Sequence, residues 1–258
     1  MRTDLSVIIP TFNAKARAHE TAETLHERFV RTDLKAEILL VDDGSDEHQR
    51  PDASQLPEGV RVVQLERNRG KGYAVRTGLL ASSGRARIFT DVDLPYGTES
   101  LLECYHALVD SDADLVHGDR SLPGSRVVSR LRKRRRISSV VFRVAVLTVA
   151  GLRQADTQCG LKGIRGEVVA RMLAVLQTDG FAFDVEIFRC ARDSGLTVKP
   201  IAVHLVNADD STVRLLRDST SMLRDLLAIR IRSIRGEYRL DANTDHTSGI
   251  AAAEGFSS

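Results

Sequence analysis

The chain of 258 residues contains no tryptophan, and aromatic residues make up only 5% of it. Cysteine is also scarce: Cys104, Cys159 and Cys190 are odd in number and follow no ligand spacing. This scarcity argues against a disulfide scaffold or a structural zinc site, and it favours a reducing compartment. A hydrophobic content of 42% is nevertheless enough to build one large α/β core.

Long apolar runs are missing as well. A membrane-spanning helix needs roughly 18–20 consecutive apolar residues, whereas the longest run here, Val140 to Leu152, is shorter and contains Arg143. The N-terminus passes directly into a charged residue and a predicted strand, so no signal peptide is expected. The sequence therefore predicts a protein that is soluble or peripheral to a membrane.

A large net charge is absent too, because 37 basic residues face 35 acidic ones for a total of +2. The local distribution is uneven, since residues 120–136 contain basic residues and no acid. An apolar helix is predicted directly after it, at 137–152, and a basic amphipathic helix at 219–235. The basic residues of the first segment are Arg120, Arg126, Arg130, Arg132, Lys133, Arg134, Arg135 and Arg136.

The dense part of this segment, residues 130–136, has three interpretations. It could be a solvated loop, a nucleic-acid patch or a seat for an anionic lipid head group. The aromatic side chains that stack on bases are not interleaved with it, which counts against nucleic acid. The apolar segment that follows, and the second basic amphipathic helix, favour a membrane surface.

Apolar strand patterns alternate with helical patterns through the first half of the chain. This β-α alternation with short loops is typical of a doubly wound parallel sheet. In the second half we expect further helices, a strand-like segment and a disordered tail from about residue 241. The expected strands are 5–9, 37–41, 60–65, 87–90, 114–117 and 196–206. One expected helix ends near residue 29, four others span 70–83, 99–109, 166–176 and 219–235, and a further helix begins at 180–186.

Asp91-Val92-Asp93 is the most informative motif of the chain. It follows the predicted strand 87–90, and ligands of open α/β sheets bind at the carboxyl ends of the strands. Two carboxylates at this spacing can hold a divalent cation, which in turn can hold a diphosphate. An ordinary acidic turn is the alternative interpretation.

Two further polar segments are predicted at the same edge. Asp42 and Asp43 follow the second strand, where a carboxylate could accept from the N–H of a uracil or guanine base or could cap the next short helix. Asn68 to Gly72 precedes a helix, and its glycines would let a phosphate approach the backbone. This segment is not a P-loop, because no Lys-Ser/Thr follows a six-residue glycine frame, and it is not a dinucleotide fingerprint, because Val75 stands where a third glycine is needed.

The histidines show no ligand spacing, and we expect Cys159 to pack rather than to act as a nucleophile. Together the motifs resemble the inverting family 2 glycosyltransferases of GT-A fold, and within them the polyprenyl-phosphate (dolichyl-phosphate) hexosyltransferases, glucosyl more than mannosyl. The resemblance covers about residues 4–238. It is carried by segments 7–13, 41–46, 68–76, 91–93, 118–120, 156–162 and 181–186.

The resemblance implies a fold and a domain plan. The fold would be α/β, a GT-A type doubly wound, mixed but mainly parallel sheet flanked by helices, with basic amphipathic helices in the C-terminal half. One glycosyltransferase domain would span 1–240. Residues 1–118 would bind the nucleotide sugar and 119–240 the acceptor, and 241–258 would form the disordered tail.

The resemblance also implies residue roles. Asp93 and Asp156 would be catalytic, and Asp91 and Asp93 would hold Mg²⁺ or Mn²⁺. The donor would contact Pro10, Thr11, Phe12, Asn13, Asp42, Asp43, Asn68, Gly70, Lys71, Asp91, Val92 and Asp93. The acceptor would contact Arg120, Arg132, Arg134, Arg135, Arg136, Phe181, Asp184, Glu186 and Ser211.

The sequence departs from the family pattern at several positions. Phe12 and Ala14 stand where the family usually has tyrosine and glutamate, which removes a polar donor contact. Pro95 stands where mannosyl members often have glutamine. Thr212 replaces a lysine expected after Ser211, with Arg214 close enough in sequence to substitute for it.

The implied activity is metal-dependent, inverting transfer of a hexose from a nucleoside diphosphate sugar, of the UDP-glucose or GDP-mannose type, to a polyprenyl monophosphate. The protein would be cytoplasmic, peripheral at the cytoplasmic face of a membrane, and would bind no nucleic acid. A soluble acceptor is the alternative enzyme, and a catalytically silent binding protein is the alternative of another class. The base, the hexose, the prenyl length and homo-oligomer formation stay open.

Overall fold

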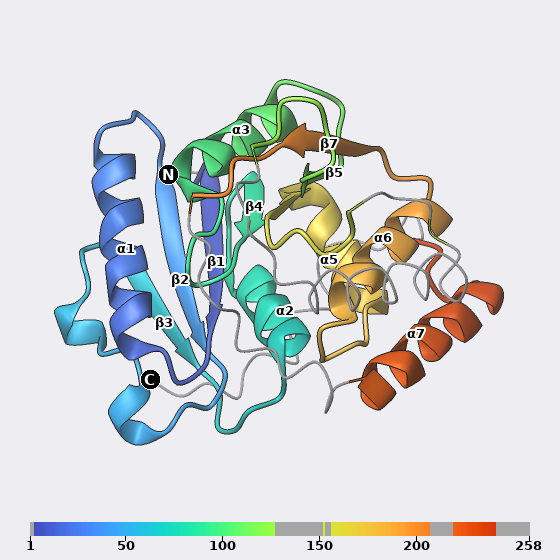
Figure 1. Ribbon diagram of the computed structural model, residues 1–258, viewed down its shortest axis with the longest axis horizontal. Helices are drawn as coiled ribbons and strands as arrows, with labels where there is room; N and C mark the ends of the chain where they lie inside the picture. Colours follow the sequence, from blue (N-terminus) through green and yellow to red (C-terminus); the bar gives the residue numbers. More distant parts are fainter. Residues whose placement is uncertain (1–2, 127–151, 153–155, 207–218, 241–258) are drawn as a thin grey trace.

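The computed structural model describes residues 3–126, 152, 156–206 and 219–240 (Figure 1). The dense basic run, most of the predicted apolar helix 137–152, Ser211 and the predicted tail lie outside these residues. Within them, no helix is long and apolar enough to cross a membrane.

The described residues form a seven-stranded sheet in the order β3-β2-β1-β4-β6-β5-β7. Its strands are parallel except β6, which runs antiparallel to both β4 and β5. The strands are β1 (Leu5–Thr11), β2 (Ala36–Asp42), β3 (Val60–Gln64), β4 (Ala86–Phe89), β5 (Leu115–Asp119), β6 (Lys162–Arg165) and β7 (Val198–Ala202). The helices are α1 (Lys15–Val30), α2 (Lys71–Ala81), α3 (Gly97–Val109), α5 (Gly166–Val175), α6 (Phe183–Asp193) and α7 (Ser219–Ile234), with short 3-10 turns at Glu47–Gln49 and Ala53–Gln55.

The predicted alternation of strands and helices is confirmed, with ends that shift by a few residues. The main omission is β6, which the sequence pattern did not predict. Because β6 enters between β4 and β5 in the opposite direction, the sheet is mixed, as the family resemblance implied and the alternation alone did not.

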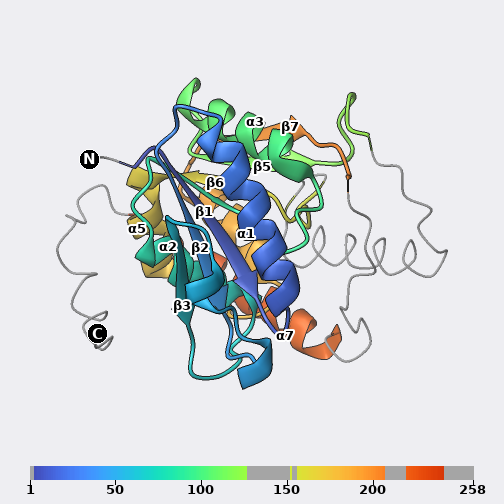
Figure 2. The ribbon, with the colours of Figure 1, turned by 90° about the vertical axis from the view of Figure 1, so that its left-hand side faces the viewer.

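The sheet separates two hydrophobic layers (Figure 2). Side chains alternate between the faces of a strand, so Ile8 of β1 packs with α2, α5 and α6, whereas Val7 and Ile9 pack with α1 and α3. Both faces of the central strands are therefore covered, which explains their continuous apolar pattern.

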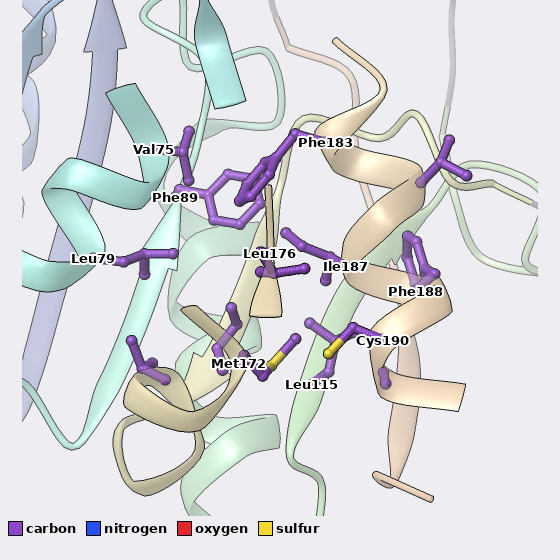
Figure 3. Packing of buried hydrophobic residues seen from close by; sticks show 14 of the residues in the cluster. Val75, Leu79, Phe89, Leu115, Met172, Leu176, Phe183, Ile187, Phe188 and Cys190 are labelled. Carbon is purple, nitrogen blue, oxygen red and sulfur yellow. The ribbon is translucent and has the colours of Figure 1, made fainter. Parts of the chain in front are cut away.

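Apolar side chains fix the start of α6 near the end of β4 (Figure 3). Phe183, the first residue of α6, packs against Phe89, the last residue of β4, with ring centroids 6.3 Å apart. This contact fixes the start of α6 against the carboxyl end of β4. The neighbouring residue, Asp184, is thereby brought to the edge where Asp91 lies.

Helix α2 approaches the sheet closely at Gly78. A Cβ at this position would lie 2.4 Å from Ile8 Cγ2 and 2.9 Å from Val41 Cγ2. We expect Gly78→Ala to lower the free energy of unfolding by about 1–2 kcal/mol in urea denaturation, because overpacking of rigid β-branched neighbours outweighs the gain of about 1 kcal/mol in helix propensity. Leu80→Ala, on the exposed side of the same helix, is the control and should change little. A Gly78→Ala protein more stable than the parent would contradict this packing.

Candidate functional site

The two predicted acidic segments lie at one edge of the sheet. Asp42 ends β2, paired in register with Thr11 at the end of β1, and Asp91 follows β4, the other neighbour of β1. The Asp91 carbonyl accepts from Leu94 N at 3.0 Å, and Leu94 has a φ of 41°. Asp91-Val92-Asp93 therefore forms a tight turn just past the strand, as predicted.

Lys71 directs its ammonium at this turn. Its Nζ lies 2.6 Å from Asp91 Oδ1 and 3.7 Å from Asp184 Oδ2. Burial by itself would lower the pKa of Lys71, but the two carboxylates outweigh burial and raise it. The Lys71 ammonium is therefore shared between Asp91, in the turn after β4, and Asp184 of α6.

A second lysine holds Asp184 from the inside of the molecule. Lys162 is completely buried, and its Nζ donates to Asp184 Oδ1 at 2.8 Å and to the Cys159 carbonyl at 2.6 Å. The rings of Phe89 and Phe188 lie 5.6 and 5.7 Å from Nζ, within the range of a cation–π attraction. Burial would raise the pKa of Asp184, but Lys162 and then Lys71 lower it. Lys162, Asp184, Lys71 and Asp91 thus form a row of alternating charge, which we call the charge row.

Arg120 and Asp156 form a second ion pair beside the charge row. Arg120 Nε lies 2.6 Å from Asp156 Oδ2, Nη2 lies 2.7 Å from Oδ1, and the Arg120 backbone N–H adds a third bond. Burial would raise the pKa of Asp156, but Arg120 lowers it. The segment that begins at Asp156 reaches the Asp91–Asp93 turn, because a Cβ on Gly160 would lie 2.0 Å from Asp91 Oδ2.

Asp42 and Asp43 both hold loops in this structure. Asp42 accepts from the backbone N–H and hydroxyl of Ser45 and so closes the turn after β2, whereas Asp46 is the N-cap of the next short helix. Asp43 accepts from the N–H groups of Arg69 and Gly70, each at 2.8 Å. It therefore fixes the glycine-rich segment in place, and burial raises its pKa. Recognition of a base by Asp43 stays a prediction.

The first motif lies against the same loops. Asn13 has a φ of 50°, and its side chain joins Asp46 through two hydrogen bonds. Phe12 beside it is 48% exposed although it is a large apolar side chain, so its ring is available to a planar ligand. The remaining predicted donor residues lie in three segments. Pro10 and Thr11 end β1, Val92 lies in the Asp91–Asp93 turn, and Asn68 lies in the glycine-rich segment.

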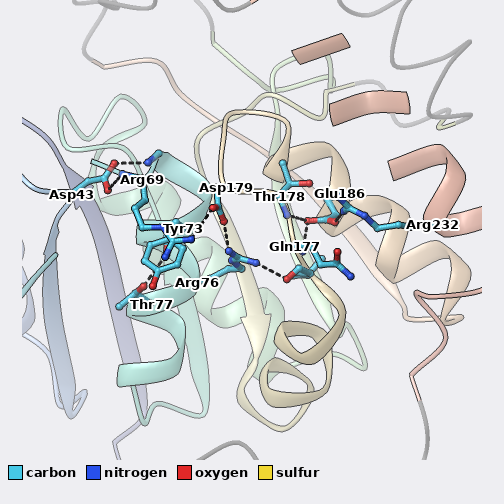
Figure 4. Close-up of polar contacts among 12 residues, drawn as sticks. Asp43, Arg69, Tyr73, Arg76, Thr77, Gln177, Thr178, Asp179, Glu186 and Arg232 are labelled. Atoms are coloured by element: carbon cyan, nitrogen blue, oxygen red, sulfur yellow. Dashed lines mark hydrogen bonds and ion pairs between the residues drawn. The ribbon is translucent and has the colours of Figure 1, made fainter. Parts of the chain in front are cut away.

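Hydrogen bonds to Asp179 connect the glycine-rich segment and the start of α2 to the second half of the chain (Figure 4). The Asp179 carboxylate accepts from Arg69 Nη2 at 3.2 Å and from Arg76, and its carbonyl accepts from Tyr73 N at 3.1 Å. Gly70 has a φ of +106°, and a Cβ there would lie 2.6 Å from the same carbonyl. Only glycine satisfies both constraints. The loop predicted to bind phosphate is therefore held closely against a segment from the C-terminal half of the chain.

Glu186, predicted at the acceptor site, is buried between α6, α7 and the Asp179 loop. Its carboxylate is fully buried and accepts from the N–H groups of Gln177 and Thr178, from Arg232 and from Tyr238 Oη (Figure 4). The protein itself supplies these partners, because α6 turns this side of the helix toward α7. In the structure this carboxylate anchors the Asp179 loop and the C-terminal segment to one another, and a role of Glu186 at the acceptor site stays a prediction.

The remaining acceptor residues divide into two groups. Arg120 and Asp184 lie in the ion pairs described above, and Phe181 is 45% exposed at the start of the α6 region. Arg132, Arg134, Arg135, Arg136 and Ser211 lie outside the described residues, so their roles stay predictions.

Sequence reasoning missed the two residues that connect the halves, Lys162 and Asp179. Lys162 had only a weak signal: it is a lone charge between Leu161 and Gly163-Ile164, and a lysine that is buried requires a carboxylate partner. Asp179 had none, because an acid beside a glycine is typical of any turn.

The residues present fit a divalent cation together with a diphosphate. The described part of the chain contains no group of three or more His, Cys, Asp or Glu side chains that could hold a metal. A Mg²⁺ site commonly uses one or two carboxylates, with phosphate oxygens and water completing the shell. Asp91 and Asp93 supply that number, and the Lys71 ammonium already places a cation on Asp91.

The fold is that of the GT-A glycosyltransferases. Glucosyl-3-phosphoglycerate synthase from Mycobacterium tuberculosis, solved with Mn²⁺, UDP-glucose and phosphoglyceric acid, superposes with a TM-score of 0.64 at 16% identity, over 93% of this chain and 81% of that one. Residues 6–173 match the family described as Glycosyl transferase family 2. The chain belongs to that family.

Relatives of known activity show which members of the family the chain is similar to. A dolichyl-phosphate β-glucosyltransferase from Dictyostelium discoideum is 30% identical over 253 residues, which cover 92% of this chain and 76% of the relative. The dolichyl-phosphate β-glucosyltransferase of Homo sapiens is 29% identical over 92% of this chain and 78% of its own. The family resemblance stated from the motifs is thereby confirmed.

The ion pairs of the site predict how stability depends on pH. Asp156 and Asp184 have pKa values below the ordinary one, so the unfolded chain binds their protons more readily than the folded protein. Their contribution to stability is therefore complete above the unfolded pKa of about 3.9 and is lost as the pH falls through the lower folded pKa. Asp43, whose pKa is raised, acts with the opposite sign.

We expect the free energy of unfolding to fall in urea denaturation as the pH drops below about 4 and on through the lower folded pKa values of Asp156 and Asp184. Asp156→Asn should show a shallower fall, because it removes one carboxylate whose folded pKa lies below its unfolded value. Asp112→Asn, on an exposed loop, is the control and should keep the parental slope. Equal slopes in Asp156→Asn and the parent would contradict the assigned role of the Arg120–Asp156 pair.

Proposed function

We propose that the protein transfers a hexose from a nucleoside diphosphate sugar to a polyprenyl monophosphate, with inversion at the anomeric carbon. One observation carries the proposal: an acidic turn suited to a metal–diphosphate and an arginine suited to a phosphate meet at one sheet edge. Asp91 lies against Gly160, and Arg120 is paired with Asp156, four residues earlier. The likeness to dolichyl-phosphate glucosyltransferases over 92% of the chain supports the same pair of substrates.

The donor would lie across the ends of β1, β2 and β4. Phe12 offers an exposed ring and Asp43 a carboxylate near the base, and the segment that Asp43 and Asp179 hold would face the diphosphate. Asp91 and Asp93 would hold Mg²⁺ or Mn²⁺, which when bound supplies charge neutralisation for the departing diphosphate. Lys71 is the nearest described ammonium to that position.

The acceptor phosphate would bind at Arg120, whose planar guanidinium matches phosphate geometry. Asp156 orients this guanidinium through two hydrogen bonds to its nitrogens. A phosphate monoester is anionic near neutral pH, so its oxygen can attack without a strong general base. The chain's task is therefore to align that oxygen opposite the leaving diphosphate, which agrees with a site rich in ion pairs and without an activated histidine.

A soluble phosphorylated acceptor is the second candidate. It is favoured by the structural likeness to a synthase solved with phosphoglyceric acid, although at 16% identity that likeness shows the fold alone. The chemistry at Arg120 would be the same for both acceptors, because each presents a phosphate. The two differ in whether a prenyl chain and a membrane surface are needed.

Helix α7 supports a membrane-bound acceptor. Leu223, Leu227, Ile231 and Ile234 are 48%, 49%, 48% and 71% exposed, and their spacing places them on one stripe of the helix. Leu226 and Ile229 are buried on the opposite side. Arg224 and Arg235 are exposed beside the stripe. An apolar stripe flanked by arginines fits the interface of an anionic membrane, and we infer a peripheral position at its cytoplasmic face.

We expect Asp93→Asn to lower transfer of glucose from UDP-glucose to a polyprenyl phosphate by about 10²-fold or more, the usual effect of losing one group that stabilises developing charge. EDTA should abolish the activity of the parent, and Mn²⁺ or Mg²⁺ should restore it. The mass of the lipid product is the measurement, and Asp112→Asn is the matched control. Parental activity of Asp93→Asn, with the fold confirmed by circular dichroism, would contradict the assignment.

The α7 stripe can be tested on vesicles. We expect Leu227→Ser together with Ile231→Ser to weaken sedimentation with vesicles containing phosphatidylserine by several-fold, since each exposed apolar side chain contributes about 1 kcal/mol or more when it enters the interface. Leu80→Ser, exposed on the far helix α2, is the control. The double variant should keep its UDP affinity. Unchanged sedimentation would show that this stripe is not the membrane contact.

A further inference from the structure

We propose that Lys71 is a resident counter-ion of Asp91, which leaves this carboxylate when a divalent cation and a nucleoside diphosphate bind together, and that Asp184 is the site to which its ammonium moves. The inference rests on the proposed function, because it takes Asp91 and Asp93 as the metal ligands.

The first step is the position of the ammonium. Lys71 Nζ lies 2.6 Å from Asp91 Oδ1, which is hydrogen-bond distance. A cation coordinated by that carboxylate would need the same oxygen or its near neighbour. On the other side, Asp91 Oδ2 is closely backed by Gly160, where even a Cβ would lie 2.0 Å away. Metal and ammonium therefore compete for the open side of one carboxylate.

The second step is the presence of another place for the ammonium. Asp184 Oδ2 lies 3.7 Å from the same Nζ. A small rotation of the lysine side chain, without any change of backbone, would bring the ammonium onto this oxygen. Lys71 can thus release Asp91 without being left uncompensated, which a buried charge would not tolerate.

The third step is that Asp184 cannot follow the ammonium. Its other oxygen is held by Lys162 at 2.8 Å, and Lys162 is enclosed between Phe89 and Phe188 with no solvent exposure. Lys162 thereby acts as a positioning residue. It keeps Asp184 ionised and fixed, so that the second place for Lys71 exists before the ligands arrive.

The charges decide when the exchange occurs. The Lys71 ammonium offsets the negative charge of Asp91 before any ligand binds. A bare divalent cation must displace or repel a positive charge a few ångströms away, which weakens its binding. A nucleoside diphosphate brings negative charge that attracts both the cation and the ammonium, so the two ligands should strengthen one another. Binding free energies are reciprocal, and the coupling must appear from either side.

A simpler role for Lys71 makes a different prediction. If Lys71 only contacted the donor, removing its charge would weaken UDP binding and leave the binding of the metal alone unchanged. Under the counter-ion role, removing the charge makes Asp91 more available, so the metal alone binds more tightly. The sign of one measurement separates the two.

The experiment measures Mn²⁺ binding by electron paramagnetic resonance, with and without UDP, in the full-length protein. We expect UDP to tighten Mn²⁺ binding to the parent. We expect Lys71→Met to tighten the binding of Mn²⁺ alone by about tenfold, the order expected for removing a unit charge close to the ion. The tightening by UDP should shrink by a similar factor. Lys71→Arg keeps the charge and should retain weak binding of Mn²⁺ alone.

Lys199→Met removes an exposed lysine of β7 and is the matched control for net charge. Equal or weaker binding of Mn²⁺ alone to Lys71→Met would overturn the counter-ion role, while binding of Mn²⁺ with UDP to the parent would leave the proposed metal site standing. Failure of the parent to bind Mn²⁺ even with UDP would overturn the metal site itself, and the counter-ion role with it.

Discussion

The bond between the buried Lys162 ammonium and Asp184 is the interaction on which the site depends. Lys162 comes from the antiparallel strand β6, which pairs with β4, and Asp184 from the start of α6, so their contact holds α6 against the strand beside β4. A charge with no access to water must be paired. The requirement fixes α6 over the sheet edge and leaves one Asp184 oxygen facing Lys71. The charge row thus follows from a single buried lysine.

A second set of bonds gives the glycine-rich segment its shape. Asp43 holds the segment from the sheet side, and Asp179 holds it from the C-terminal half of the chain. Glu186 in turn fixes the Asp179 loop to Arg232 at the end of α7. The helix with the exposed apolar stripe is therefore linked, by a short series of hydrogen bonds, to the segment proposed to face the donor diphosphate.

Much of the fold was predictable because its signals are local. The apolar strands and the acids that follow them are contiguous in sequence, and a parallel sheet places their carboxyl ends together. Strand β6 was missed because its four residues include a lysine and a glycine, so neither an alternating nor a continuous apolar pattern marks it. Its direction depends on partners far along the chain, which periodicity does not contain.

The site was predictable in its composition but less so in its pairings. Spacing indicated Asp91 and Asp93, and the family resemblance indicated Lys71 and Asp156. The structure brings the described ion pairs of these segments to one edge. The spacing did not indicate that Glu186 faces inward while Asp184, two residues earlier, faces the site. That difference arises from the helical rotation of α6 and from Tyr238 and Arg232, which are distant in sequence.

The most direct test of the account is a matrix of donors and acceptors with the unmodified protein and Mn²⁺. UDP-glucose and GDP-mannose would each be offered with a polyprenyl phosphate in vesicles and with soluble phosphoglycerate, and the products would be identified by mass. The account predicts a hexosyl polyprenyl phosphate from one of the donors and little or no product with the soluble acceptor. Efficient glycosylation of phosphoglycerate, with no lipid product from either donor, would contradict it.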